Sequence, residues 1–225
     1  MRTKFSSELA ALTRELGRLA GLAHEAAERV ALAVTETDLT AAYEVFALDE
    51  KLQEKYGACE NRAVILLALE APVARDLRHV VSAIQIADDL SQLGWLTSSI
   101  ADSVVRRYPH PVAPPEIITP LAEIGRLTTI LAARVVDVIV ATGHPIPDAE
   151  LVVPDPALAH TCQRVLQLLA SPEWPHHSAM AVDLALLVHH YERCAEHCVR
   201  IGRLIRFFHT GIPLSAQASA ESPPA

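Results

Sequence analysis

The sequence predicts an all-α fold built as two tandem three-helix bundles. Of its 225 residues, 51% are hydrophobic but only 4% are aromatic, and only 8 are glycine. Ala and Leu favour helices, whereas the aromatic residues typical of sheets are scarce. Prolines near mid-chain divide six helical patterns into two sets of three. We expect bundles at residues 1–108 and 116–209, a proline-rich linker at 109–115, and a disordered tail at 210–225.

Three long helical patterns predict the first bundle. Apolar residues between positions 5 and 30 recur alternately every four and three residues, which keeps one apolar stripe on a helix. Asp38 can cap a second helix, and Pro72 interrupts that helix just after Glu70. The third pattern runs from about residue 73 to 108 and ends at the prolines.

The second bundle begins after the proline cluster. An apolar stripe over residues 121–138 predicts a fourth helix, which the Gly-His-Pro sequence at 143–145 ends. Asp155 and the proline after it supply an N-cap and a first helical residue for a shorter fifth helix. A sixth helix runs to about residue 209. Residues 210–225 are mostly Ser, Ala and Pro. They have too few large apolar side chains for burial to offset the conformational entropy that the chain would lose on folding.

Charge and hydropathy exclude several classes of protein. With 19 basic and 27 acidic residues, the net charge is −8. A negative net charge disfavours binding of nucleic acid or an anionic membrane over much of the protein surface. It does not exclude a local basic patch. No apolar run is long enough for a transmembrane helix. Four cysteines without a signal-like start are expected to be thiols of a cytoplasmic protein.

Catalytic signatures are missing from the sequence. It contains no Gly-rich phosphate loop, no G-x-S-x-G elbow, no H-E-x-x-H motif and no C-x-x-C pair. Substrate pockets are commonly built from loops, and glycines let the backbone approach a substrate, but this sequence has few of either. We therefore expect a protein that is not an enzyme.

One segment of the sixth predicted helix concentrates groups that can bind metal. Glu192 and Glu196 are four residues apart and project from one face, where paired carboxylates can bridge a divalent or iron-type cation. A solvated face with Glu–Arg pairs is the alternative interpretation. Next to this pair runs a stripe of zinc-type groups that also suits a buried helix face: His190, Cys194, His197 and Cys198.

Four segments of the chain carry a specific resemblance. They are MRTKFSSELAALTRELGRLAGLA, LLALEAPVARDLRHVVSAIQIADDL, PLAEIGRL and EWPHHSAMAVDLALLVHHYERCAEH. With them the chain resembles the PhoU family, in its actinobacterial form, from residue 1 to about 209. The resemblance implies the PhoU-like six-helix repeat and a homodimer. It also implies a cytoplasmic negative regulator that relays phosphate sufficiency from the Pst phosphate ABC transporter to the sensor histidine kinase of the Pho regulon. Such a regulator contacts the transporter ATPase subunit and the kinase, and reaches the membrane only through these proteins.

The resemblance also implies a metal motif, because the family carries E/D-x-x-x-D in its third and sixth helices and several members bind iron, zinc or similar metals there. In the third helix Asp89 and Gly94 match the pattern, but the two ligand positions hold Ser91 and Trp95. An indole has no lone pair for a cation. The resemblance therefore implies that the first-repeat site is lost.

In the sixth helix the motif keeps Glu192 and His197, while Glu196 stands where the family usually has Asp. These three residues form the candidate metal site. This chain also has fewer acidic residues at other positions, because Gln53 and Ala159 stand where related chains have acidic residues. Without those carboxylates a multinuclear cluster would lack neutralising charge. We expect no required cofactor and little dependence on metal.

Asp76 and Arg78, in the D-L-R stretch at the start of the third helix, match the family pattern fully. Together with Asp89, they are the candidate partner-binding residues. A purely structural role is the alternative, because an acid in the first turn complements the helix dipole.

Three hypotheses for the function follow. The first is an adaptor that represses phosphate-starvation signalling. The second is a metal-binding helical protein that uses the sixth-helix carboxylates. The third is a divergent paralogue that keeps the scaffold but has other partners.

Overall fold

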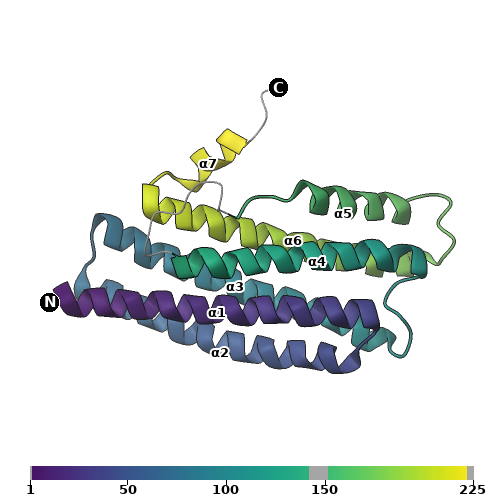
Figure 1. Cartoon of the computed structure of the whole chain (residues 1–225), viewed down its shortest axis with the longest axis horizontal. Coiled ribbons are helices and arrows are strands. Elements are labelled where there is room, and N and C mark those ends of the chain that lie inside the picture. Colours follow the sequence, from purple (N-terminus) through teal and green to yellow (C-terminus); the bar gives the residue numbers. More distant parts are fainter. Residues whose placement is uncertain (1, 142–151, 222–225) are drawn as a thin grey trace.

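The computed structural model describes residues 2–141 and 152–221, which are helical and contain no strand (Figure 1). The helices are α1 (Arg2–Glu36), α2 (Leu39–Glu70), α3 (Ala74–Arg107), α4 (Pro115–Val140), α5 (Pro156–Leu169), α6 (Ser178–Thr210) and α7 (Leu214–Glu221). The predicted all-α fold is confirmed, and a helix is found for each of the six predicted patterns. The stop signal at 143–145 lies outside the described residues. Within those residues no helix is long and apolar enough to cross a membrane.

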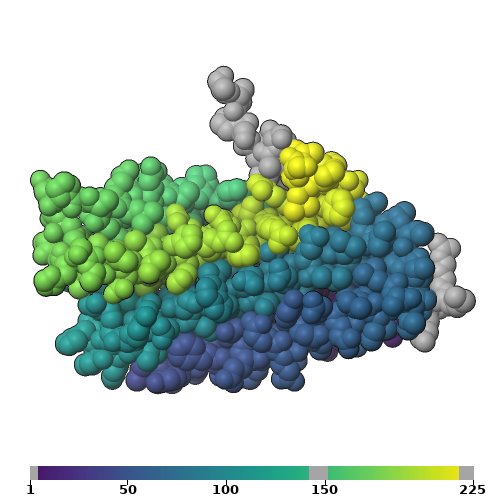
Figure 2. Space-filling model, turned by 180° about the vertical axis from the view of Figure 1, so that it is seen from behind, coloured from purple at the N-terminus to yellow at the C-terminus, as the bar shows by residue number. Residues whose placement is uncertain are grey.

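The first six helices form two sets of three that pack through a shared central layer. α1 packs on α4, and α3 packs on α6. In each set the middle helix lies outside this layer, so that α2 covers α1 and α3 while α5 covers α4 and α6. Figure 1 shows α2 and α5 on opposite sides of the molecule, and Figure 2 shows its elongated shape from behind. One cluster of buried apolar side chains joins both sets into a single core.

Small residues allow α1 and α4 to approach closely. Ala23 and Ala27 of α1 are buried, and the Thr129 hydroxyl of α4 donates to the carbonyl oxygen of Ala27 at 3.3 Å. A Cβ added to Gly125 would lie 3.3 Å from the Cβ of Ala31. The alanine-rich composition therefore does more than favour helices, because it sets the spacing of the central layer.

Two predicted helix caps are present. The Asp38 carboxylate accepts hydrogen bonds from the amides of Thr40, at 2.8 Å, and Ala41. The Asp155 carboxylate does the same for Ala157, at 2.8 Å, and Leu158. Each cap satisfies amides that have no partner inside the helix.

The predicted disordered tail is wrong in part. Thr210 ends α6, and α7 forms over residues that were expected to be irregular. The Gln217 side-chain amide donates to the carbonyl oxygens of Ile212, at 2.8 Å, and Arg203, at 3.2 Å. Gln217 is buried. Gln217 and the partly buried Leu214 thus tie α7 to the rest of the protein, and composition alone does not reveal such contacts. Residues 222–225 lie outside the description.

Gly202 lies where the chain that leads into α5 crosses α6. A Cβ on this glycine would lie 2.8 Å from the carbonyl oxygen of Val152 and 3.1 Å from its Cβ. Val152 is itself buried. The crossing therefore has no room for a larger residue on α6.

We predict opposite effects for two Gly→Ala substitutions. Gly202→Ala should lower the free energy of unfolding by about 1–3 kcal/mol, because the backbone at Val152 must move. Gly57→Ala should raise it by up to about 1 kcal/mol, because Gly57 is exposed inside α2 with nothing within 4 Å of an added Cβ. Urea unfolding followed by circular dichroism measures both. Stabilisation by both variants would contradict the close crossing.

Candidate functional site

A buried ionic cluster, formed by Asp89, His197 and Arg200, links the two sets of helices. Asp89 of α3 is the one fully buried carboxylate among the described residues. Its Oδ1 accepts from Nδ1 of His197 at 2.8 Å and from the Arg200 guanidinium at 2.6 Å, both on α6. Oδ2 of Asp89 has no hydrogen-bond partner among these residues. A buried carboxylate is tolerated only with such charged partners, so the cluster fixes how α3 packs on α6.

This geometry corrects the expected role of Asp89. A partner protein cannot reach a carboxylate that is fully covered by α3 and α6. His197 is only 13% exposed, while the Arg200 side chain is 43% exposed and extends toward solvent. Asp89 therefore acts in interhelical pairing and not in partner binding.

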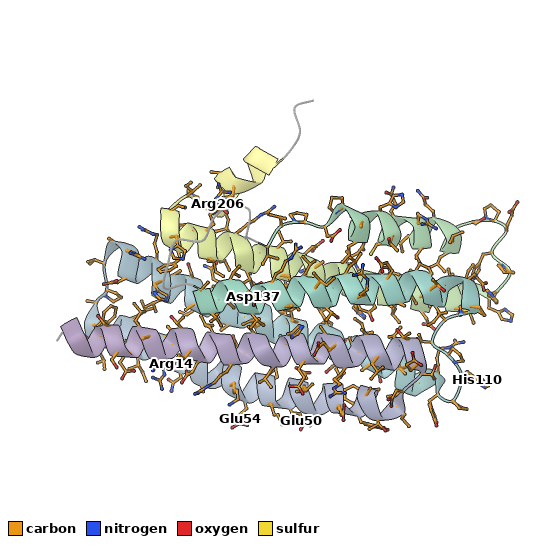
Figure 3. All side chains as sticks on the ribbon, viewed as in Figure 1. Arg14, Glu50, Glu54, His110, Asp137 and Arg206 are labelled. Atoms are coloured by element: carbon orange, nitrogen blue, oxygen red, sulfur yellow. The ribbon has the colours of Figure 1, made fainter. Side chains whose placement is uncertain are left out.

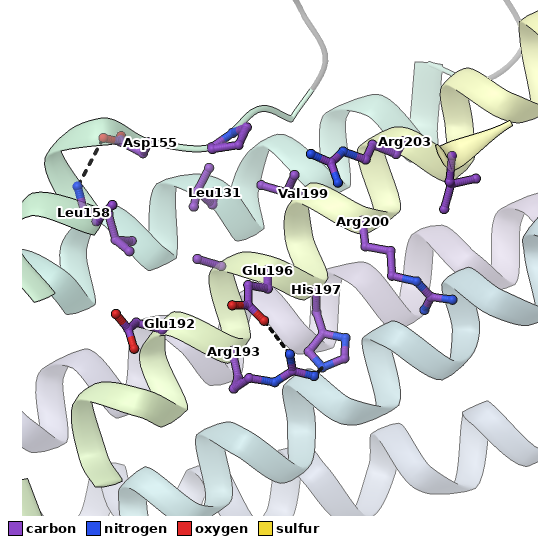
Figure 4. Close-up of a pocket in the computed structure, with 14 residues that line it drawn as sticks. Leu131, Asp155, Leu158, Glu192, Arg193, Glu196, His197, Val199, Arg200 and Arg203 are labelled. Carbon is purple, nitrogen blue, oxygen red and sulfur yellow. Dashed lines mark hydrogen bonds and ion pairs between the residues drawn. The ribbon is translucent and has the colours of Figure 1, made fainter. Parts of the chain in front are cut away.

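The three candidate metal ligands do not converge. Glu196 is exposed and pairs with Arg193 on its own helix (Figure 4). His197 instead pairs with the buried Asp89. Glu192 points into a cavity of about 590 Å³ between α4, α5 and α6, and burial raises the pKa of its carboxyl. A Glu–Arg pair of the kind expected for a solvated face is thus present at Glu196.

The described residues do not fit the metal that the family resemblance implies. Within residues 2–141 and 152–221, no three His, Cys, Asp or Glu side chains are grouped to hold an ion. Two of the candidate groups already have a charged partner, and a cation would have to displace it.

The zinc-type stripe is a packing surface. Cys194 and Cys198 are buried and free, and burial raises the pKa of Cys194 well above its usual range and that of Cys198 to about 12. Both are therefore thiols, which are poor ligands and poor nucleophiles. The His190 ring packs edge-on against Trp95, with the ring centroids 6.1 Å apart.

In the first repeat, a hydrogen-bonded network of Asp49, Gln53, Ser91 and Ser98 occupies the degenerate motif. The Ser91 hydroxyl donates to the Gln53 side chain at 2.8 Å, and the Gln53 amide donates to Asp49 at 2.9 Å. The Ser98 hydroxyl donates to the second oxygen of Asp49 at 3.0 Å. These bonds join α2 to α3 with polar groups that need no metal.

Gly94 and Trp95 belong to the same motif but have different surroundings. A Cβ on Gly94 would lie 2.6 Å from Oδ1 of Asp49, so the glycine makes room for that carboxylate. Trp95 is 56% exposed. The indole packs against His190, and more than half of it faces solvent.

Asp76 and Arg78 lie far from both clusters, at the end of the molecule where α1 and α3 begin and α6 ends. Asp76 is exposed in the first turn of α3, and the cap residue Val73 makes no side-chain cap bond. Arg78 is half-buried beside the turn after α6, with its Cζ 3.5 Å from the position of a Cβ on Gly211. Burial, aided by the charge of Arg75, lowers the pKa of the neighbouring His79 to about 4, so His79 is neutral at pH 7.

Comparison with known proteins assigns the family. The PhoU domain model matches residues 16–104. The phosphate-specific transport system accessory protein PhoU homolog 2 of Mycobacterium tuberculosis is 36% identical over 211 residues, which are 94% of this chain and 99% of the relative. Homolog 1 of Mycobacterium leprae is also 36% identical, over 94% and 95% of the two chains. The chain belongs to the PhoU family.

Solved PhoU structures share the fold. The phosphate transport system regulatory protein PhoU from Streptococcus pneumoniae superposes with a TM-score of 0.75 at 20% identity, over 92% of this chain and 98% of the other. PhoU from Pseudomonas aeruginosa gives a TM-score of 0.74 at 18% identity, over 92% and 100%. Because PhoU proteins are accessory and regulatory proteins, the expectation that this chain is not an enzyme is confirmed.

Sequence reasoning on this PhoU protein missed two kinds of residue. Arg200 follows His197 by three positions, so the helical period could have placed both on one face, but no pattern shows that Asp89 lies opposite. Asp49 and Ser98 were not singled out at all. They become partners only because α2 packs on α3.

We predict that the Asp89 cluster stabilises the protein as a unit. Arg200→Met should lower the free energy of unfolding by roughly 2–3 kcal/mol, less than the ~3–5 kcal/mol of a fully buried pair because His197 remains. In the double variant, Asp89→Asn should recover part of this lost stability, because burying a neutral amide without the arginine costs less free energy than burying a carboxylate. Urea unfolding of wild type, both single variants and the double variant gives the coupling energy. Simple additivity of the two substitutions would contradict the cluster.

We also predict that metal ions do not stabilise this protein. After treatment with a chelator, addition of Mn²⁺ or Fe²⁺ under anaerobic conditions should leave the Tm unchanged, because binding to the folded state would raise it. Metal analysis of wild type and Glu192→Ala is the companion measurement. Stoichiometric metal in wild type that disappears in Glu192→Ala would contradict this expectation.

Proposed function

We propose that this PhoU protein is a negative regulator of phosphate sensing and uptake. In this proposal it is a cytoplasmic homodimer that acts as an adaptor between the phosphate ABC transporter, through the ATPase subunit, and the sensor histidine kinase. The observation that carries the proposal is the match along 94% of the chain to relatives named as accessory proteins of the phosphate-specific transport system.

The side-chain chemistry is consistent with action by contact. Among the described residues, the carboxylate of Asp89 and the thiols of Cys194 and Cys198 are buried in helix packing. None of them is presented to a substrate in a form suited to nucleophilic or acid–base catalysis. Long exposed helix faces, by contrast, suit protein partners.

One observation supports a second candidate, a divergent paralogue with other partners. Trp95 stands at a ligand position of the family motif and is 56% exposed. Exposed aromatic side chains are frequent anchors of protein interfaces. A changed surface at this position would change which proteins bind, while the scaffold stays the same.

Deletion of the gene tests the proposed function. Loss of the protein should raise alkaline phosphatase activity in phosphate-rich medium, because the kinase is no longer held inactive. Expression of the wild-type gene from a plasmid should restore repression. Phosphatase activity that stays low in the deletion strain would count against the regulator and favour the paralogue.

A further inference from the structure

A second cavity, here called the terminal cavity, opens at the end of the molecule where α1 begins. Its volume is about 490 Å³, and α1, α3 and the end of α6 enclose it. Phe5, Leu9 and Phe208 give it apolar walls, while Arg14, Arg75 and Asp76 supply its charged groups. Figure 3 places Arg14 on α1 and Arg206 at the end of α6, both toward this end. A cavity with apolar walls and charged groups around it suits an amphipathic ligand.

Two arginines, Arg14 and Arg75, line the terminal cavity, and Arg78 lies at the same end of the molecule. Several other arginines pair with carboxylates, as Arg62 does with Glu8 and Glu15. None of Arg14, Arg75 and Arg78 forms an ion pair with a described residue. Arg75 instead lies over the Phe208 ring, 5.4 Å from its centroid. Asp76 is the single carboxylate among the groups that line the cavity. This end is therefore locally positive in a protein whose net charge is −8.

Arg78 adds a buried donor that lacks an acceptor. Its Nε is shielded from solvent and makes no hydrogen bond within the described residues. The half-buried Arg78 side chain therefore places a positive charge at this end of the molecule, and no described acceptor pairs with its Nε.

Exposed apolar residues lie beside these arginines. Leu69 is 76% exposed and Val73 is 73% exposed, and they flank the turn between α2 and α3. Leu77, one turn further along α3, is also exposed. Large apolar side chains in such numbers at one end, next to unpaired cations, are typical of an interaction surface.

We propose that the terminal cavity and the α2–α3 turn form the docking surface for an acidic, amphipathic segment of a partner protein. Carboxylates of this segment pair with Arg14, Arg75 and Arg78, and one of its apolar side chains enters the cavity. The proposal rests on the proposed function, and it assigns a role to Asp76 as the group that disfavours segments with an acid at that position.

A protein segment fits these observations better than an anionic membrane does. A membrane surface is broad and would be repelled by the remainder of a chain with a net charge of −8. A short peptide segment, in contrast, interacts mainly with the charged groups close to its binding site. The apolar surface at this end also includes a concave cavity, which a side chain can fill and a flat lipid surface cannot.

Two charge reversals and one matched control test the surface. Arg75→Glu and Arg14→Glu change two residues that line the terminal cavity, one on α3 and one on α1, whereas Arg164→Glu makes the same change in charge on the exposed face of α5. The probes are the purified transporter ATPase subunit and the cytoplasmic part of the sensor kinase, with binding measured by calorimetry or biolayer interferometry at two salt concentrations. Circular dichroism checks that each variant is folded.

We expect both cavity variants to bind a protein probe about tenfold more weakly or worse, as for close charge pairs at interfaces, and Arg164→Glu to bind as wild type does. Wild-type-like binding by both cavity variants would overturn this surface while leaving the proposed function intact. If Arg164→Glu weakens binding of the probe as much as the cavity variants do, the effect reflects net charge, and the proposed surface is also overturned. If wild type binds neither protein, the proposed function fails and the surface loses its partner. Binding only to vesicles of equal parts phosphatidylcholine and phosphatidylglycerol, lost in Arg75→Glu, would show a membrane site instead.

Discussion

The packing of α1 on α4 and of α3 on α6 determines the rest of the structure. Each helix has an apolar stripe that a three-helix set covers only in part, so burying the remainder requires the other set. This packing brings Asp89 against His197 and Arg200, which lie more than 100 residues away in the sequence. It also brings the ends of α1, α3 and α6 together around the terminal cavity. The buried ionic cluster and the terminal cavity are thus consequences of how one hydrophobic core is completed.

Polar side-chain pairs occupy the positions at which the family motif would hold metal. In the first repeat, Ser91 and Gln53 join α3 to α2, and Gly94 makes room for Asp49. In the second, His197 turns inward to Asp89 and Glu196 pairs with Arg193. A bound cation and such a network can both compensate a carboxylate at a helix interface, Asp49 in the first repeat and Asp89 in the second. In this chain, protein donors provide that compensation.

Charge is distributed unevenly along the molecule. The net charge is −8, yet Arg14, Arg75 and Arg78 gather at one end without ion-pair partners among the described residues. The proposed docking surface would gain from this arrangement, because overall negative charge limits non-specific association while a local positive surface favours acidic partners. The rigid helices hold this surface in a fixed geometry, which lowers the entropy cost of binding.

The helices follow from local signals in the sequence. Apolar periodicity, the Asp38 and Asp155 caps and the prolines act within a few residues of where they lie, so the helical patterns and several boundaries could be predicted. Residues Glu192, Glu196 and His197 were correctly placed on one helix, yet their directions could not be known. Helix packing, in contrast, places His197 against Asp89, Gln217 against the end of α6, and Arg75 and Arg14 at one cavity. These contacts join residues distant in the chain, and they arise from how helix faces pack, which local sequence does not encode.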